Sequence, residues 1–441
     1  MSLYKISITN STRKNPPSGA VSSDPSSAGS GTASDSAFEG VLAAGSGAVS
    51  DPAREGILTA QNDPFFRPAW YTSEITQPPP PSSLIFQAFN KKITKLALQS
   101  VARHILRSGR VAKHLQKLVS RVSTCYRSAI AQEVPIWMRR ESGDAYFANL
   151  ATCASVWACP YCASKISERR RVELMIALAE AEKQGLKVYL FTLTLRHHKG
   201  ESLNDLLEGM SKARRLMRNR KPWKAWAAAV GLVGSVRSLE VTNGINAPVD
   251  NGWHVHTHEI LFCRDGEPLL ASDVLPMWQR ACETADLQIP DFHGVDITSA
   301  NDAVGDYVSK WGFDHELTKS MIKKGKANHL TPWDLLRHYQ TTGDEVYADL
   351  FREYVKCFYQ KRQLVWSDGL RDLLELGKEK TEQELADEKE KDDWLLGKLT
   401  LAEWRVVIKH DKRGEVEVVA KCTQDIYQVK DYIKSLEEVG G

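Results

Sequence analysis

Apolar and polar residues alternate or repeat along the middle of this chain in the two spacings that separate strands from helices. Runs rich in β-branched and aromatic residues predict strands, and apolar positions three and four residues apart predict helices. The predicted strands cover residues 187–195, 233–241 and a short stretch near Val295, and the predicted helices cover residues 91–121, 201–220, 272–286 and two or three segments of 331–376.

A further predicted strand, residues 252–262, carries histidine at every second position. Because side chains alternate between the faces of a strand, His254, His256 and His258 share one face. A single histidine among apolar residues is usually a core residue, but three in a row would leave three polar ring ends to satisfy. Imidazoles spaced in this way can hold one divalent ion, so the pattern predicts a metal site.

The preceding strand offers a carboxylate to the same site. Residues 243–248 (Asn-Gly-Ile-Asn-Ala-Pro) have the composition of a turn, which predicts a hairpin between residues 233–241 and the histidine strand. In that hairpin Glu240 can lie near the histidines and add an oxygen ligand, and a mixed set of this kind favours Mg²⁺ or Mn²⁺. The alternative is that Glu240 is a solvated strand residue.

Three cysteines are bunched at Cys153, Cys159 and Cys162. The Cys-Pro-Tyr-Cys turn places two thiolates close together, and a structural zinc ion requires four nitrogen or sulfur ligands. Cys125 is the first candidate for the fourth ligand and His114 a weaker one. A redox Cys-x-x-Cys pair would not explain Cys153, and a buried thiol cluster is the remaining alternative.

Basic residues gather on either side of these cysteines. Residues 91–121 contain nine lysines and arginines, and no acidic residue occurs between Glu74 and Glu133. A second basic helix is expected to start at Ser164 and carries Arg169, Arg170 and Arg171. Such a run can be a solvated surface, but without compensating carboxylates it favours an anionic partner such as a phosphate backbone.

Length and composition fit a soluble protein of two or three domains. The chain has 441 residues, 42% of them hydrophobic, and no run that approaches the ~18 apolar residues of a membrane span. No secretion signal is apparent, so we expect a cytoplasmic protein without membrane association. Eight cysteines in such a chain suit a metal clip in a reducing compartment. Residues 1–87 are rich in Ser, Gly, Ala and Pro, which predicts a disordered tail.

A tyrosine and a lysine lie one helical turn apart in residues 301–312. Val304, Val308 and Trp311 form an apolar stripe on a helix, with Tyr307 at its border and Lys310 on the same side. By spacing alone, such a tyrosine is most often a core residue.

Several of these segments together resemble a known family. Phe191-Thr-Leu-Thr194, His254-Val-His-Thr-His258 and Tyr307-Val-Ser-Lys310 resemble the three ordered motifs of plasmid rolling-circle replication initiators, the Rep members of the HUH endonuclease superfamily. The segments Thr152–Cys162, Ile166–Arg170 and Trp366–Arg371 look like one bacterial branch of that family. The resemblance covers about residues 120–375.

The resemblance implies an enzyme that nicks and rejoins single-stranded or hairpin origin DNA. In the family, two histidines flanking one residue bind Mg²⁺ or Mn²⁺, which corresponds to His256 and His258, with Glu240 as the third ligand and His254 as a variable one. The nucleophilic tyrosine corresponds to Tyr307, and the lysine to Lys310. Host helicase and polymerase are the implied partners.

Two positions depart from the family pattern. Thr257 replaces the bulky apolar residue usual between the metal histidines, and Ala303 stands where related initiators can carry a water-activating Glu. Asp302 and Asp306 would point away from Tyr307 on a helix. The alternatives are a non-catalytic zinc-containing DNA-binding regulator, an HUH-type transposase and, more distantly, a metallohydrolase.

The expected fold is α+β, with an HUH-type antiparallel sheet, flanking helices, a zinc-bound basic segment before it and a disordered N-terminal tail. The expected domains are a tail (1–87), a basic helical and zinc-binding segment (88–180), the nicking domain (181–315), a helical region (316–377) and a charged linker with a small C-terminal unit (378–441).

Overall fold

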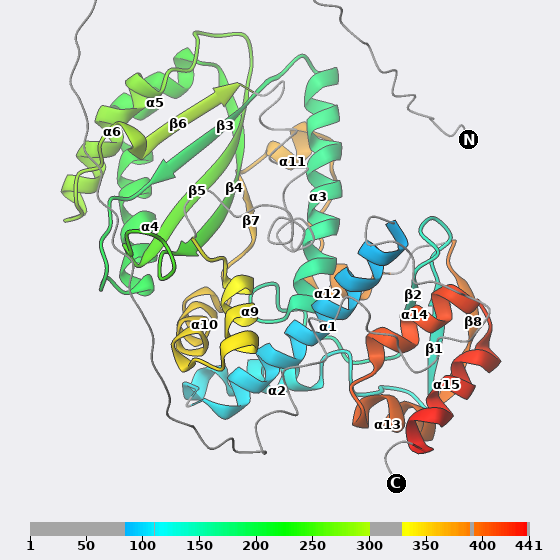
Figure 1. The fold of residues 1–441 in the computed structure, drawn as a ribbon. Coiled ribbons are helices and arrows are strands. Elements are labelled where there is room, and N and C mark those ends of the chain that lie inside the picture. Colours follow the sequence, from blue (N-terminus) through cyan, green and yellow to red (C-terminus); the bar gives the residue numbers. More distant parts are fainter. Residues whose placement is uncertain (1–83, 110, 300–328, 389–391, 439–441) are drawn as a thin grey trace, which may run out of the picture. The chain divides into compact units, whose positions relative to one another are not determined.

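The computed structural model describes residues 84–109, 111–299, 329–388 and 392–438. Its larger sheet has five antiparallel strands in the order β6-β3-β5-β4-β7 (Figure 1). These strands are β3 (Lys187–Thr194), β4 (Leu232–Asn243), β5 (Trp253–Cys263), β6 (Val295–Ser299) and β7 (Leu364–Trp366). The mixed α+β class and the antiparallel sheet are therefore confirmed. The short strand β7 lies where the sequence predicted only helices.

Three helices pack against one face of this sheet. They are α4 (Leu203–Asn219), α5 (Lys221–Ala229) and α6 (Ala271–Thr284). Phe191 and Leu193 of β3 point toward this layer and join Trp223 of α5 in the main hydrophobic core. The hydroxyl of Ser202 caps α4 by accepting a hydrogen bond from the Asp205 amide at 3.1 Å. This layer of helices packs against one face of β3 and β5, and the histidines of β5 lie on the opposite face.

A buried carboxylate anchors α4 to the centre of the sheet. Glu259 of β5 is fully buried on the helix-covered face. Arg214 donates to it at 3.0 Å, and Arg218 also donates a hydrogen bond. Burial alone would raise the pKa of Glu259, but Arg218 and Arg214 lower it below its usual value. The carboxylate is therefore ionised and shared between two guanidinium groups.

Removing this charge should strongly destabilise the protein. We expect Glu259→Gln to lower the free energy of unfolding by about 3–5 kcal/mol, because it leaves two half-buried guanidinium groups without their buried counter-charge. Urea denaturation followed by circular dichroism measures the change. The matched control is Glu283→Gln, which breaks the exposed Arg280–Glu283 pair on α6 and should cost less than about 1 kcal/mol. Equal effects of the two substitutions would contradict this assignment.

Among the described residues, a second hydrophobic core covers one end of the opposite face of the sheet. There, Ile260 and Phe262 of β5 form a second core with Leu174 of α3 (Pro160–Lys183) and Leu370 of α11 (Leu370–Leu373). Residues 254, 256 and 258 lie on this same face but farther along β5, beyond this second core. Packing thus holds the histidine face at one end, and farther along β5 the three histidines are half-buried.

The helix α3 begins earlier than predicted. It starts at Pro160 rather than at Ser164, and Cys159 is its N-cap residue. Proline suits the first turn of a helix because its fixed φ is helical and its missing N–H would have no partner there. As a consequence, Cys162 lies in the first helical turn.

A smaller antiparallel sheet joins segments far apart in the sequence. Its strands are β1 (Glu133–Met138), β2 (Ala145–Phe147) and β8 (Trp394–Thr400), in the order β2-β1-β8. The helices α13 (Leu401–Lys409), α14 (Arg413–Thr423) and α15 (Ile426–Glu438) contact this sheet. The sequence predicted a small strand and helix unit around residues 406–429. The strand instead lies before residue 406, and it pairs with β1.

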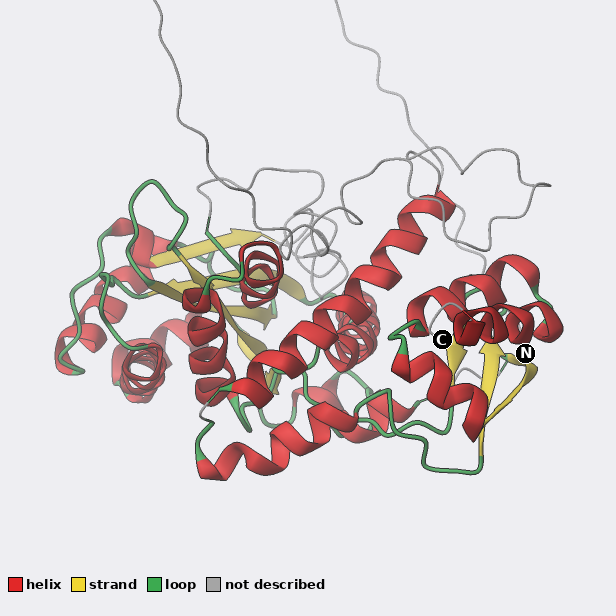
Figure 2. Ribbon diagram, turned by 60° about the horizontal axis from the view of Figure 1, so that its bottom comes forward, coloured by secondary structure: helices red, strands yellow, loops and turns green. Residues whose placement is uncertain are grey.

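Figure 2 shows the strands of both sheets in yellow and the helices in red. The remaining helical segments are α1 (Leu84–Ser108), the 3₁₀ turn η1 (Lys113–Leu115), α2 (Gln116–Thr124), the 3₁₀ turn η2 (Phe292–Gly294), α9 (Pro332–Thr342), α10 (Glu345–Phe358) and α12 (Glu382–Asp387). The helix predicted over residues 91–121 is interrupted, since α1 ends just before Gly109. None of the helices in the described ranges has both the length and the apolar composition of a membrane span.

Candidate metal centres and nucleic-acid interface

The histidine row lies in the middle of the five-stranded sheet. β4 and β5 pair as the predicted hairpin, with Glu240 directly opposite His256. The Oε2 atom of Glu240 lies 2.9 Å from Nε2 of His258. The prediction that the hairpin brings Glu240 to the histidines is therefore confirmed. Whether these side chains bind a metal stays a prediction.

The imidazole rings stand side by side along the strand. The rings of His256 and His258 are nearly parallel, with centroids 5.6 Å apart and an interplanar angle of 20°. The ring of His254 lies 3.9 Å from that of His256. The histidines are half-buried and Glu240 is exposed. Nitrogen donors and a carboxylate on an accessible face make an open site that could take a hard divalent cation and leave positions for substrate oxygens.

The surroundings of His254 and His256 keep these two rings neutral. Burial, together with the neighbouring His256 and His197, lowers the pKa of His254 to about 3. Burial lowers the pKa of His256 to about 4, although Glu240 acts in the opposite direction. Neutral imidazole is the form that ligates metals, so His254 and His256 are in the ligating protonation state at neutral pH.

Two further histidines, which the sequence pattern did not predict, adjoin the row. His197 follows β3, and its Nε2 lies 2.6 Å from Nδ1 of His254. The ring centroid of His329 lies 6.0 Å from that of His254, where Leu330 forms a bridge with Asn243 at the end of β4. The position of His197 just past a predicted strand could have indicated its place. No sequence pattern predicts the bridge that brings in His329.

The candidate nucleophile lies outside the described residues. This applies to Tyr307 and Lys310, and equally to Asp302, Ala303 and Asp306. Their predicted roles remain predictions.

The four cysteines named from the sequence come together in one cluster. The sulfur atoms of Cys125, Cys153, Cys159 and Cys162 all lie within 4.8 Å of one another, and all four side chains are buried. Cys125 follows α2, Cys153 lies in the loop before α3, and the other two belong to the start of α3. Of the two candidates for the fourth position, it is Cys125 rather than His114 that joins the group.

The arrangement of these thiols suits a tetrahedral metal site. The Sγ of Cys125 lies 3.5 Å from that of Cys162 and 3.7 Å from that of Cys159. Burial alone would raise the pKa of Cys159, but hydrogen bonds from the other three thiols lower it well below its ordinary value. The thiolate form of Cys159 is thus favoured even though its neighbours are three protonated thiols. Four sulfur donors with no free side form the closed set that structural zinc sites use.

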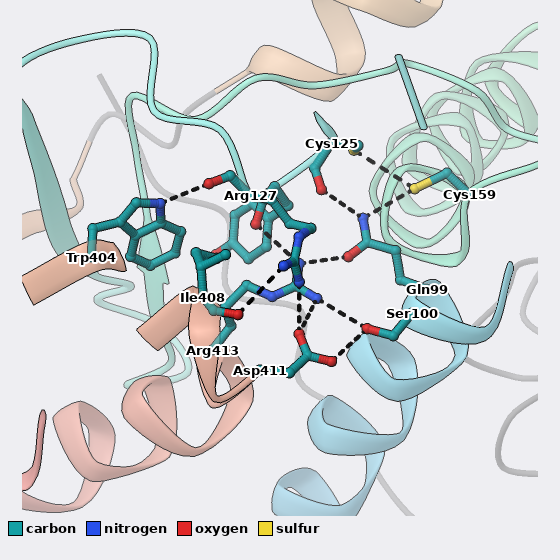
Figure 3. Close-up of polar contacts among 10 residues, drawn as sticks. Gln99, Ser100, Cys125, Arg127, Cys159, Trp404, Ile408, Asp411 and Arg413 are labelled. Carbon is teal, nitrogen blue, oxygen red and sulfur yellow. Dashed lines mark hydrogen bonds and ion pairs between the residues drawn. The ribbon is translucent and has the colours of Figure 1, made fainter. Parts of the chain in front are cut away.

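Polar contacts connect this cluster to the C-terminal helices (Figure 3). Gln99 of α1 donates through Nε2 to the Cys125 carbonyl at 3.2 Å and to Sγ of Cys159 at 3.4 Å. Its Oε1 accepts a hydrogen bond at 2.8 Å from Arg413, which also pairs with Asp411. Arg413 is 1% exposed. A buried charge from α14 therefore orients the amide that contacts the thiolate.

The arginines predicted to bind DNA differ in their surroundings. Arg170 is buried, pairs with Glu173 and Glu379, and donates to the Lys380 carbonyl at 2.8 Å. Its guanidinium is therefore used within the protein and is not available to a phosphate. Arg171 forms a more exposed pair with Glu168, and Arg169 lies 3.9 Å from Glu388. Arg169 and Arg171 remain the candidates for DNA contact.

Part of the basic N-terminal surface is also neutralised. Asp411 accepts a hydrogen bond from Arg127 at 2.9 Å and from Ser100 at 2.7 Å. Arg121 donates a hydrogen bond at 2.8 Å to the amide oxygen of Gln383, which holds the guanidinium without neutralising its charge. A carboxylate of the C-terminal region thus compensates part of the positive charge of the acid-free stretch between Glu74 and Glu133.

Comparison with known proteins identifies the family. Residues 146–413 match the family model described as "Replication protein". This is more than half of the chain, and the chain belongs to the replication protein family. It is 26% identical over 306 residues to "Protein rep" of Streptomyces lividans, covering 53% of this chain and 66% of that protein. It is 29% identical over 150 residues to "Neomycin resistance protein" of Streptomyces cyanogenus, covering 29% of this chain and 33% of that protein. The search of solved structures found no match.

Proposed function

We propose that this protein initiates plasmid rolling-circle replication by nicking single-stranded origin DNA with Tyr307 and later rejoining the strands. The observation that carries the proposal is the row of His256 and His258 beside Glu240 on an accessible sheet face. Membership in the replication protein family supports the choice of DNA as substrate. The resemblance of residues 307–310 to the tyrosine motif of rolling-circle initiators supports the choice of nucleophile.

The proposed metal site uses His256, His258 and Glu240 to hold Mg²⁺ or Mn²⁺. The bound ion would neutralise the charge that builds on the non-bridging oxygens of the scissile phosphate. The sheet contributes the fixed positions of the ligands. Because α4 anchors β5 from behind through Glu259, the histidines of that strand are held rigidly in register.

Tyr307 forms and breaks the covalent bonds. Its phenolic oxygen attacks the phosphorus and displaces the 3′ oxygen, which takes up a proton and leaves as a 3′-OH that a polymerase can extend. The phenol loses its proton in this step, and a nearby positive charge such as Lys310 favours that loss, since the reference pKa is about 10. The phosphotyrosine conserves the ester energy, so rejoining requires no ATP.

The cysteine cluster has a structural role in this proposal. Zinc bound by Cys125, Cys153, Cys159 and Cys162 would tie the end of α2 to the start of α3. The C-terminal half of α3 packs against the sheet through Leu174, and Arg169 and Arg171, in the first half of the same helix, are the proposed DNA contacts. The zinc cluster would thereby place a DNA-binding helix against the nicking site.

The decisive experiment detects the covalent intermediate. The full-length protein is incubated with Mn²⁺ and 3′-labelled single-stranded oligonucleotides that tile the replicon encoding it, because the downstream fragment stays on the tyrosine. We expect a labelled band that resists denaturation, that requires Mn²⁺ and that is absent in Tyr307→Phe. Tyr339→Phe, which changes an ordinary tyrosine of α9, serves as the control and should retain the adduct. Tight binding of an oligonucleotide without any adduct would instead support a non-catalytic regulator.

A further inference from the structure

Every imidazole of the row is held at its Nδ1 atom by a residue of β3 or of the loop that follows it. Nδ1 of His258 lies 2.9 Å from Oγ1 of Thr192. Nδ1 of His256 lies 3.1 Å from Oγ1 of Thr194. Nδ1 of His254 lies 2.6 Å from Nε2 of His197. The three contacts run in order along the boundary between β3 and β5.

The strand register explains why these contacts repeat. β3 and β5 are antiparallel, with Thr192 opposite His258 and Thr194 opposite His256. Alternate residues share a face, so both hydroxyls point to the histidine side. The pairing of β3 ends at Thr194, and residues 195–198 form a loop. His197, in this loop, takes the place that the next strand residue would have had opposite His254.

The backbone determines the tautomer at the end of the row. Nδ1 of His197 lies 3.0 Å from the carbonyl oxygen of Asn251. A carbonyl only accepts, so Nδ1 of His197 carries the proton, and in the neutral ring Nε2 is then an acceptor. His254 must donate to it through its own Nδ1–H. The Nε2 atom of His254 is left with its lone pair, as a metal ligand requires.

The threonines restrict ring orientation without fixing the tautomer. A hydroxyl can donate or accept, so Thr192 and Thr194 can hold Nδ1 in either protonation state. This matters at His258, whose Nε2 lies 2.9 Å from Glu240 and is the atom proposed to face the cation. The hydroxyl of Thr192 can hold this ring in place whichever ring nitrogen carries the proton.

We propose that Thr192, Thr194 and His197 are positioning residues that hold the histidines by Nδ1 so that their Nε2 atoms face the divalent cation, with His254 prepared as an additional ligand. This inference rests on the proposed function, because it assumes that the row binds the cation. It also gives a physical role to the Phe-Thr-Leu-Thr segment of β3. Groups that orient ligating histidines typically change metal affinity about 10–100-fold.

The test measures Mn²⁺ affinity by electron paramagnetic resonance of the free ion. The full-length wild type is compared with Thr192→Val, Thr194→Val and His197→Phe. We expect each variant to weaken Mn²⁺ binding about 10-fold or more, with an unchanged melting temperature. Thr192→Ser retains the hydroxyl and should bind Mn²⁺ with wild-type affinity. Thr298→Val, the same exchange on neighbouring β6, is the control, since Thr298 contacts Asp296 rather than a histidine.

A spectroscopic measurement separates positioning from general stability. Long-range ¹H–¹⁵N correlation spectra of histidine-labelled, metal-free protein report which ring nitrogen carries the proton. We expect the Nδ1–H tautomer at His254 in the wild type and its loss in His197→Phe. Mn²⁺ binding that is the same in wild type and His256→Ala would contradict the proposed metal site itself. Wild-type binding that depends on His256 but is unchanged by the three variants would overturn only this inference.

Discussion

Alanine at His256 or His258 should reduce nicking by at least about 10³-fold, which corresponds to roughly 4 kcal/mol of lost transition-state stabilisation. In the proposed mechanism each substitution removes a nitrogen donor from the metal site, and the phosphate would then lose the cation that neutralises its developing charge. Glu240→Gln should have a smaller effect, because the amide retains an oxygen but not the negative charge. The rate of adduct formation at saturating Mn²⁺ is the measurement.

Exposed residues of the same types provide the controls. His293→Ala in η2 and Glu267→Gln in the loop after β5 change residues that lie outside the histidine row. Both variants should nick at the wild-type rate. Normal Mn²⁺-dependent nicking by His256→Ala would show that the catalytic ion is held elsewhere.

The second large effect concerns the cysteine cluster. We expect one zinc ion per chain by elemental analysis and its loss in Cys159→Ser, together with a decrease of about 5 kcal/mol or more in the free energy of unfolding. The reason is that zinc binding by a buried Cys₄ set is itself folding energy, of the order of 10 kcal/mol in small zinc domains.

A buried cysteine outside the cluster is the matched control. Cys282→Ser alters a fully buried thiol of α6 and should leave the zinc content at one per chain. If the purified wild-type protein contains no zinc, and the Cys159→Ser variant is as stable as the wild type, the four thiols are only a buried cluster.

The histidine site was predictable because its determinants are local. Alternation along residues 252–262 fixes which side chains share a face, and the turn at 243–248 fixes the hairpin that brings in Glu240. The cysteine cluster was predictable in the same way for the three residues near the start of α3. Cys125 could only be named as a candidate, because its approach depends on how α2 packs against α3.

Features that depend on distant segments were not predictable. The basic surface appeared uncompensated because Asp411, which pairs with Arg127, lies 284 residues farther along the chain. The burial of Arg170 depends on the segment before α12, and β1 finds its second partner in β8. No periodicity or local composition reports such contacts. The helix start at Pro160, by contrast, was available from the sequence, since proline favours the first helical turn.

The central claim is that a tyrosine and the histidine-bound cation act on the same phosphate. The most direct test is to isolate the adduct formed with Mn²⁺ and the tiled oligonucleotides, digest it with protease and nuclease, and locate the attached nucleotide by mass spectrometry. The account predicts a 5′-nucleotide on Tyr307, formed by the wild type and not by His256→Ala. A nucleotide on a different residue, or one that forms equally well without the metal ligands, would contradict it.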